Sequence, residues 1–178
     1  MGTPREPAPA KYFAALLSPS AAWLTQVEAD LTAAFGAIDA RSAIVPWTLS
    51  TFYEKEMGGG LLRRFCSFSP LRSPGDLARL KLQTQQIEER YRDQRSGGRR
   101  VNLDPGYLDP LKVVLASTKN ANQRIYLHSG IYAEATLLYH DGGFHGQPYT
   151  YRDYLWPETL EFFTALRAAY LGQLRNLR

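Results

Sequence analysis

The chain has 178 residues, a length typical of one domain, and its 44% hydrophobic and 21% charged residues exclude wholesale disorder and fibrous structure. Its one cysteine, Cys66, excludes an internal disulfide framework and a four-thiolate zinc site, and it is typical of a reducing compartment. No apolar run approaches the roughly 18 residues that a membrane span needs, and residues 1–9 carry neither a secretory nor a myristoylation signal. We therefore expect a cytoplasmic protein without a membrane partner.

Positive charge is concentrated in one part of the chain. The net charge is +4, and residues 63–100 hold ten basic and four acidic side chains. A basic stretch of this kind favours anionic partners such as phosphates or nucleic acid. The alternative is a solvated helix face, which we favour for the end of the stretch, residues 90–100.

Hydrophobic periodicity divides the first part of the chain into alternating strands and helices. A Pro-rich leader over residues 1–9 is expected to be disordered. A strand over 11–17 is followed by a helix over 18–36 and by an extended stretch over 38–49 that Pro46 interrupts. A strand over 62–68, a helix over 73–91 and a strand over 99–103 come next. Residues 53–60 are predicted to be a loop, and Asp104-Pro105-Gly106 a turn. This order is typical of a ferredoxin-like βαββαβ fold.

The rest of the chain adds to that core. Residues 111–117 fit either a strand or a helix, and segments 124–127 and 131–137 flank a short Gly-containing loop that predicts a β-hairpin. An amphipathic helix is predicted from Pro157 onward. The predicted fold class is therefore α+β, a single domain over residues 10–178 with a ferredoxin-like core, an appended hairpin and a C-terminal helix.

Four separated motifs resemble those of a bacterial family known as domain of unknown function 4416. They are Tyr53-Glu54-Lys55-Glu56-Met57-Gly58, Arg100-Val101-Asn102-Leu103-Asp104-Pro105-Gly106-Tyr107, Leu115-Ala116-Ser117-Thr118-Lys119 and Gly130-Ile131-Tyr132-Ala133-Glu134. The resemblance runs from about residue 11 to about residue 174. The family brings no established activity with it, although some members are described as GTP-binding proteins.

The sequence lacks the usual means of binding GTP. The Gly-x-x-x-x-Gly-Lys-Ser/Thr pattern that wraps backbone N–H groups around phosphates is absent. In Thr118-Lys119-Asn120-Ala121, Ala121 stands where a guanine-reading motif would place an Asp. If the chain binds GTP, as the resemblance suggests, we expect it to use another architecture.

Charged and polar side chains lie at the ends of predicted elements and in turns, where function collects on a scaffold. We predict that several of them converge in a cleft, drawn from Glu54, Glu56, Arg64, Asn102, Asp104, Lys119, Glu134 and Asp153. Arg64 and Lys119 would bind phosphate or carboxylate oxygens, and the backbone of Gly58–Gly60 would add N–H donors.

The carboxylates of Glu54, Glu56, Asp104 and Glu134 would bind Mg²⁺, a candidate cofactor, or act as a general base. The alternative is that these charges form structural ion pairs, such as Arg64 with Glu134.

Two tyrosines complete the predicted ligand-binding set. Asn102 and Tyr107 flank the Asp-Pro-Gly segment without being needed for a turn, which favours the edge of a site. Tyr132 and Glu134 share one face of a predicted strand, where they would orient a ligand or simply face solvent. We assign no metal ligand, because His140 and His145 fit an ordinary hairpin tip.

Two hypotheses for function follow. The first is a domain that binds an anionic small molecule, either a phosphorylated metabolite or a nucleotide, in the mixed-charge cleft. The second is a non-catalytic RNA- or protein-binding accessory module that uses the basic surface over residues 63–100. A nucleic acid is the less favoured partner, because the aromatic signature of RNA-recognition strands is absent.

Overall fold

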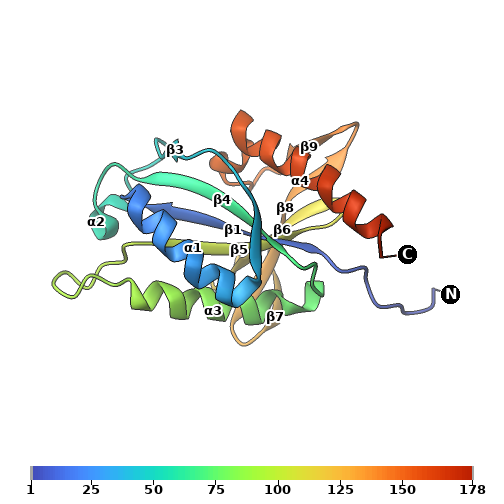
Figure 1. Cartoon of the computed structure of the whole chain (residues 1–178), viewed down its shortest axis with the longest axis horizontal. Coiled ribbons are helices and arrows are strands. Elements are labelled where there is room, and N and C mark those ends of the chain that lie inside the picture. The colour runs from blue at the N-terminus through green and yellow to red at the C-terminus, as the bar shows by residue number, and fades with distance from the viewer. Residues whose placement is uncertain (1, 178) are drawn as a thin grey trace.

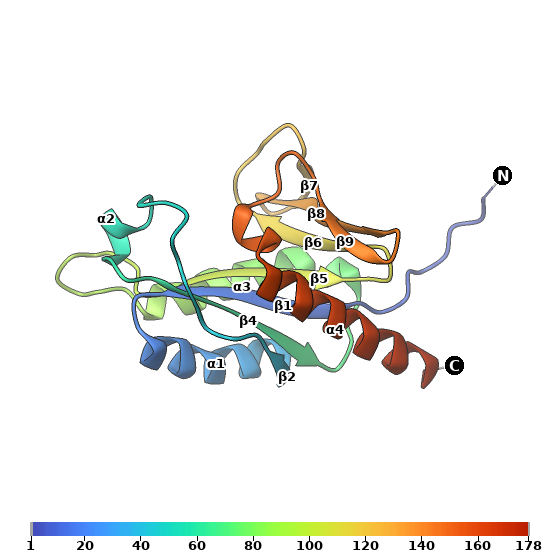
Figure 2. The same ribbon diagram turned by 90° about the horizontal axis from the view of Figure 1, so that it is seen from above.

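The computed structural model describes residues 2–177, which form one large antiparallel sheet with helices on both faces (Figures 1 and 2). The main strands are β1 (Lys11–Ser18), β2 (Ala37–Arg41), β4 (Leu62–Ser69), β5 (Asn102–Leu108), β6 (Lys112–Ser117), β7 (Ile125–His128) and β8 (Ile131–His140). They lie in the sheet in the order β2-β4-β1-β5-β6-β8-β7. Two short strands extend it: β3 (Val45–Pro46) pairs with β4, and β9 (Gly143–Gly146) pairs with β8. The predicted α+β class is confirmed.

The two helices of the first part cover the same face of the sheet. Helix α1 (Ala21–Phe35) links β1 to β2, and α3 (Leu77–Arg90) links β4 to β5. Ser20 accepts a hydrogen bond from the backbone of the first turn of α1, and Gly36, at φ 98°, ends the helix. The predicted end at residue 36 is confirmed, whereas the helix begins at Ala21 and not at residue 18. Alternate residues of β1, namely Tyr12, Ala14 and Leu16, pack beneath these helices.

Helix α4 (Pro157–Arg175) covers the opposite face, preceded by the short turn η2 (Arg152–Leu155). The ring of its Phe163 lies 4.9 Å from the ring of Phe13 and 5.5 Å from that of Phe65 of β4. Phe13 lies between Tyr12 and Ala14 in β1 and therefore faces the opposite side of the sheet from them. Every residue of β1 is buried, because helices cover both of its faces and strands pair with both of its edges. The predicted C-terminal helix and the predicted hairpin of β7 and β8 are both present.

Residues 104–106 do not form the predicted turn. They lie inside β5, which pairs with β1 along its whole length. Gly106 is needed for close packing, because a Cβ there would lie 2.5 Å from the ring of Phe13 and 2.4 Å from the carbonyl oxygen of Val114. Pro105 lies beyond the last residue that pairs with β6, where one edge of the strand is open and a residue without an N–H is tolerated.

The remaining differences from the sequence prediction are local. Residues 111–117, which fitted either helix or strand, form β6, and the predicted loop over 53–60 contains one helical turn, α2 (Glu54–Met57). The stretch interrupted at Pro46 is two short strands. Residues 2–8 are exposed and have no regular secondary structure; their description as a leader, separate from a single domain, stays a prediction.

Strands β5 and β6 separate at one end, and this separation positions the site. They pair only from Gly106 to Leu108, so residues 102–105 pair with β1 alone. On the other side, Ala116 and Ser117 of β6 pair with β8 alone. The sheet is therefore open between these two strands, and side chains from both of its faces reach the opening.

Candidate functional site

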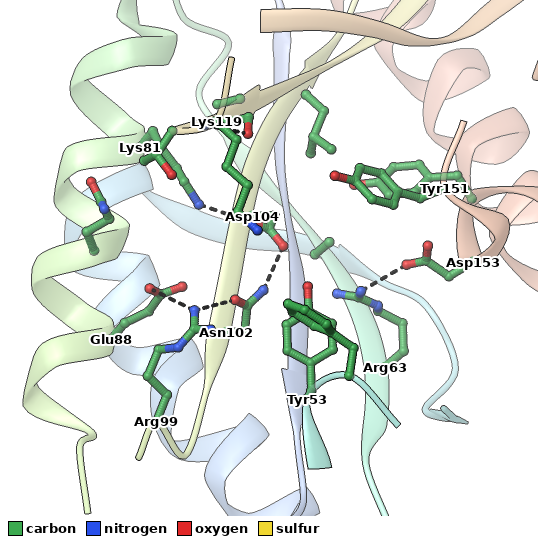
Figure 3. A pocket seen from close by; sticks show the side chains of 18 of the residues that line it. Tyr53, Arg63, Lys81, Glu88, Arg99, Asn102, Asp104, Lys119, Tyr151 and Asp153 are labelled. Atoms are coloured by element: carbon green, nitrogen blue, oxygen red, sulfur yellow. Dashed lines mark hydrogen bonds and ion pairs between the residues drawn. The ribbon is translucent and has the colours of Figure 1, made fainter. Parts of the chain in front are cut away.

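A cavity of about 490 Å³ occupies the opening between β5 and β6 (Figure 3). Helix α3 and the first half of β5 form one wall, and β4 with the segment 151–154 forms the other. Two loops border the mouth, one before and into α2 and one after β6. Charged side chains of both signs line it together with five aromatic side chains, Trp47, Phe52, Tyr53, Tyr151 and Tyr154.

Arg63 is a deeply buried cation that lines this cavity. It shares one face of β4 with Phe65, because successive side chains of a strand alternate between faces, and its residue is only 5% exposed. Its Nη2 lies 2.9 Å from Oδ2 of Asp153, and its guanidinium lies 5.0 Å from the ring centre of Trp47. Its Nε and Nη1 have no hydrogen-bond partner among the described residues. Two donors of a buried cation are thus left unused in a residue that lines the cavity.

Asp153 and Tyr154, two residues of η2 that line the cavity with Arg63, are also buried. Burial raises the pKa of Asp153, and the positive charge of Arg63 opposes that shift. The neighbouring Tyr154 is 2% exposed, and its hydroxyl has no hydrogen-bond partner within residues 2–177. Burial also raises the pKa of this phenol well above its ordinary value, so it remains a neutral donor. Arg63 and Tyr154 therefore both line the cavity and both carry buried donors without a partner among the described residues.

The opposite wall is a hydrogen-bonded network that neutralises itself. Lys81 of α3 donates to Oδ1 of Asp104 at 2.9 Å and to the carbonyl of Leu103 at 3.0 Å. Asn102 donates to Oδ2 of Asp104 at 2.7 Å. Burial opposes ionisation of Asp104, but Lys81 and Arg63 outweigh it, so the pKa of Asp104 is lowered. Asp104 is an ionised acceptor in this wall.

Arg99 connects that wall to α2. It binds Glu56 with two hydrogen bonds, Nε to Oε1 at 2.7 Å and Nη2 to Oε2 at 2.8 Å, and it donates from Nη1 to Asn102 at 2.7 Å. The hydrogen bond from Arg99 lowers the pKa of Glu56. Behind Arg99, burial raises the pKa of Glu88, which accepts a hydrogen bond from the backbone of Leu103. The α2 segment is thereby held against the mouth.

The mouth on the β6 side is organised by Arg124. Its Nε lies 2.8 Å from Oε2 of the buried Glu134, its Nη1 donates to the carbonyl of Lys119, and its Nη2 donates to the hydroxyl of Tyr151. The Lys119 side chain is exposed, lies 5.6 Å from the ring centre of Phe52, and has no carboxylate partner among the described residues. Lys119 is therefore a free cation at the entrance.

The structure brings together only part of the set that the sequence singles out. Glu56, Asn102, Asp104 and Lys119 line the cavity, together with Asp153. Glu54 is exposed on α2, and Gly58, at φ 86°, ends that turn without lining the cavity. The residues that do not line it are Glu54, Gly58, Arg64, Tyr107, Tyr132 and Glu134.

Arg64 points to the other face of the sheet. Its Nη1 lies 2.8 Å from Oε1 of Glu28 on α1, so the predicted pairing of Arg64 with Glu134 is wrong. Glu134 instead supports Arg124 from behind. Since Arg63 and Arg64 are adjacent in a strand, only one of them can face the cavity, and that one is Arg63.

The two predicted tyrosines also pack elsewhere. Tyr107 lies 5.9 Å from Tyr12 on the helix-covered face, and Tyr132 lies 5.3 Å from Tyr126 in the β7–β8 hairpin. Neither ring lines the cavity. Alternation along a strand again decides the outcome, because Tyr107 and Asp104 are three residues apart and therefore face opposite sides.

The predicted Mg²⁺ ligands do not meet. Within residues 2–177 no three His, Cys, Asp or Glu side chains gather as a metal ion would require. Asp104 and Glu56 both line the cavity but are engaged by Lys81 and Arg99, whereas Glu54 is exposed and Glu134 is buried behind Arg124.

Sequence reasoning missed several residues that line the cavity: Tyr53, Arg63, Lys81, Arg99, Arg124 and Tyr154. For Lys81 a signal was present, because it follows Leu77 by four residues and precedes Thr84 by three, which puts a charge on the apolar face of a helix. For Arg63 the signal was incomplete. The strand pattern separates it from Arg64 but does not say which face contains a cavity.

An α+β protein with a mixed-charge cavity at an opening in its sheet is the class that the fold and the site define. The chain matches the family model "Domain of unknown function (DUF4416)" over residues 8–170 and belongs to that family. Searches of curated proteins and of solved structures found no match. Across residues 2–177, each helix is too short or too polar to cross a membrane.

Proposed function

We propose that the cavity binds an anionic small molecule, a phosphorylated metabolite or a nucleotide, with Arg63 as the ligand of its anionic group. The observation that carries this proposal is a buried guanidinium in the lining of a cavity of about 490 Å³, two of whose nitrogens have no partner among the described residues. An unsatisfied buried donor costs about 1–3 kcal/mol, and more when it is charged. Phosphate oxygens would satisfy both nitrogens, because the planar fork of arginine matches their geometry.

Two further features support the proposal. The cavity volume falls within the range of about 300–1,000 Å³ that is usual for small-molecule sites. The cation of Lys119 at the mouth has no carboxylate partner among the described residues and would attract an incoming anion. Mg²⁺ enters the proposal only as a companion of ligand phosphates, because it is usually held by substrate phosphates and waters together with one or two carboxylates. GTP would then bind without a P-loop.

The test is thermal unfolding against a panel of inorganic phosphate, acetate, ribose 5-phosphate, GMP and GTP, each with and without Mg²⁺. A ligand at 100 times its Kd stabilises the folded protein by about 2.7 kcal/mol. The Arg63→Lys variant keeps a cation beside Asp153 but loses the fork, so we expect it to lose the ligand-induced shift. Arg64→Lys is the matched control, because it makes the same change one residue away on the opposite face, and its shift should equal that of the wild type.

Two outcomes would reject the proposal. One is that no phosphorylated compound raises the unfolding temperature. The other is that Arg63→Lys and Arg64→Lys reduce the shift equally. Stabilisation by acetate as strong as that by phosphate would reassign the anionic group to a carboxylate.

The alternative of an RNA- or protein-binding module has weaker support. Of the ten basic side chains in residues 63–100, nine have a carboxylate or carbonyl partner, and only Arg95 has none in the described part of the chain. Each such partner offsets part of the positive charge that a polyanion would meet. Salt-sensitive retention of RNA by the wild-type protein, without any response to small phosphates, would favour this alternative.

We also infer that β1 to β5 form a ferredoxin-like unit. Support comes from the crossovers: β1-α1-β2 steps over β4, β4-α3-β5 steps over β1, and both helices lie on one face. Strands β6 to β9 and α4 then extend this unit. A solved structure of the protein would test the inference, and a parallel neighbour within the first five strands would contradict it.

A further inference from the structure

The side of the cavity that leads from Arg63 to the mouth is aromatic. The guanidinium of Arg63 lies 5.0 Å from the ring centre of Trp47, Trp47 lies 5.9 Å from Tyr53, and Tyr53 lies 5.1 Å from Phe52. All four residues line the cavity. Consecutive rings meet edge to face, at interplanar angles of 78° and 90°. These rings form a continuous aromatic wall, defined here as Trp47, Tyr53 and Phe52, that begins at the proposed anion ligand and ends in solvent.

The outer end of the aromatic wall is exposed to solvent. Phe52 is 69% exposed, and Tyr151, which borders the same cavity from another loop, is 45% exposed. A single exposed apolar residue is ordinary. Two exposed rings on separate loops around one cavity, with the Lys119 cation 5.6 Å from one of them, form a platform of the kind that binds planar rings.

We propose that the ligand carries a planar aromatic ring in addition to its anionic group, and that this ring stacks on Phe52 at the mouth. This inference rests on the proposed function, since it takes the anionic group to be bound at Arg63. A phosphorylated molecule without a ring, such as a sugar phosphate, would leave Phe52 and Tyr151 in water. Every base has a π-face and can stack on an aromatic side chain. The aromatic wall would therefore favour ligands that have a planar ring over ligands that lack one, without distinguishing one base from another.

The experiment compares three ligands that share one phosphorylated pentose. Ribose 5-phosphate, AMP and GMP are titrated into the full chain by calorimetry. We expect AMP and GMP to bind at least about tenfold more tightly than ribose 5-phosphate, the equivalent of ~1.4 kcal/mol. Phe52→Ala should remove most of this advantage and leave the affinity for ribose 5-phosphate unchanged, whereas Phe52→Trp should retain it. Tyr126→Ala is the control, because Tyr126 is also exposed but lies in the β7–β8 hairpin outside the cavity.

The outcomes separate this inference from the proposed function. If ribose 5-phosphate binds as tightly as the two nucleotides and Arg63→Lys weakens all three, the anion site stands and the ring-binding role of Phe52 is rejected. The same rejection follows if Phe52→Ala weakens all three ligands equally. If none of the three binds, the proposed function and this inference both fail.

Discussion

The adjacent residues Arg63 and Arg64 lie on opposite faces of the sheet and have different partners. On the face covered by α1, Arg64 and Arg41 both pair with Glu28, at 2.8 Å each, in a region filled by packed side chains. On the other face, Arg63 pairs with Asp153 alone and keeps two nitrogens unpartnered at a cavity. Arg64 also leaves its Nε unpartnered, but it does not line this cavity. An unused donor therefore suggests binding only where there is room for a ligand.

Packing explains why the faces differ. Helices α1 and α3 lie side by side over their face and fill it with apolar side chains. On the opposite face α4 covers one end, around Phe13 and Phe163, and the separation of β5 from β6 leaves the other end unfilled. The difference between the faces can be tested by variants that act on one face alone.

The largest expected difference is in thiol reactivity. Burial raises the pKa of the Cys66 thiol on the helix-covered face to about 12. A cysteine introduced by Ser117→Cys would lie half-buried at the cavity, and an unperturbed cysteine thiol has a pKa of about 8.5. At pH 8 we expect the introduced thiol to react with a disulfide reagent more than about a thousandfold faster than Cys66 in the folded protein, since only the thiolate reacts. In urea both should react alike, and fast labelling of Cys66 in the folded wild type would contradict the closed face.

The next effect is on stability at the cavity face. Arg63→Met leaves the buried Asp153 carboxylate without its cation, and breaking a buried pair in this way costs about 3–5 kcal/mol. Urea unfolding measures the loss. Adding Asp153→Asn should restore most of it, because the unpaired charge is then gone. Equal instability of the single and double variants would mean that lost packing, not the charge, is responsible.

A smaller loss is expected on the helix-covered face. Glu28→Gln removes the charge shared by Arg64 and Arg41 but keeps an acceptor of the same size, so we expect a cost of about 1–3 kcal/mol in urea unfolding. The ligand-induced shift of the thermal panel should be unchanged, because this network does not border the cavity. If the variant folds normally but loses the ligand-induced shift in unfolding temperature, the two faces of the sheet are coupled.

The smallest effect concerns the clamp between Glu56 and Arg99. Because the pKa of Glu56 is lowered in the folded state, its contribution is present above about pH 5 and is lost as the pH falls through the folded pKa. Both side chains are partly exposed, so we expect a contribution below about 1 kcal/mol. The stability difference between wild type and Glu56→Gln should be constant near neutral pH and shrink below about pH 4. A difference that grows in acid would contradict the clamp.

Only some of the predicted site residues line the cavity, and the reason is physical. Asn102, Asp104 and Lys119 were singled out because they lie near element ends, and the opening between β5 and β6 places such residues around one cavity. Arg64 was predicted on the same ground, and Tyr107 because it flanks the predicted turn, but both face the other side of the sheet. Position along the chain identifies residues near the end of an element, whereas the face depends on which residues of each strand meet the helices.

The sequence by itself determined the elements whose pattern is local. Helical spacing of apolar residues and the caps at Ser20 and Gly36 define α1, because these interactions form between residues a few positions apart. Only the tertiary structure decided that Asp104-Pro105-Gly106 continues a strand and that Arg63, not Arg64, faces the cavity. Both outcomes depend on contacts between residues far apart in sequence, Gly106 with Phe13 and Arg63 with Asp153, and local propensity carries no information about them.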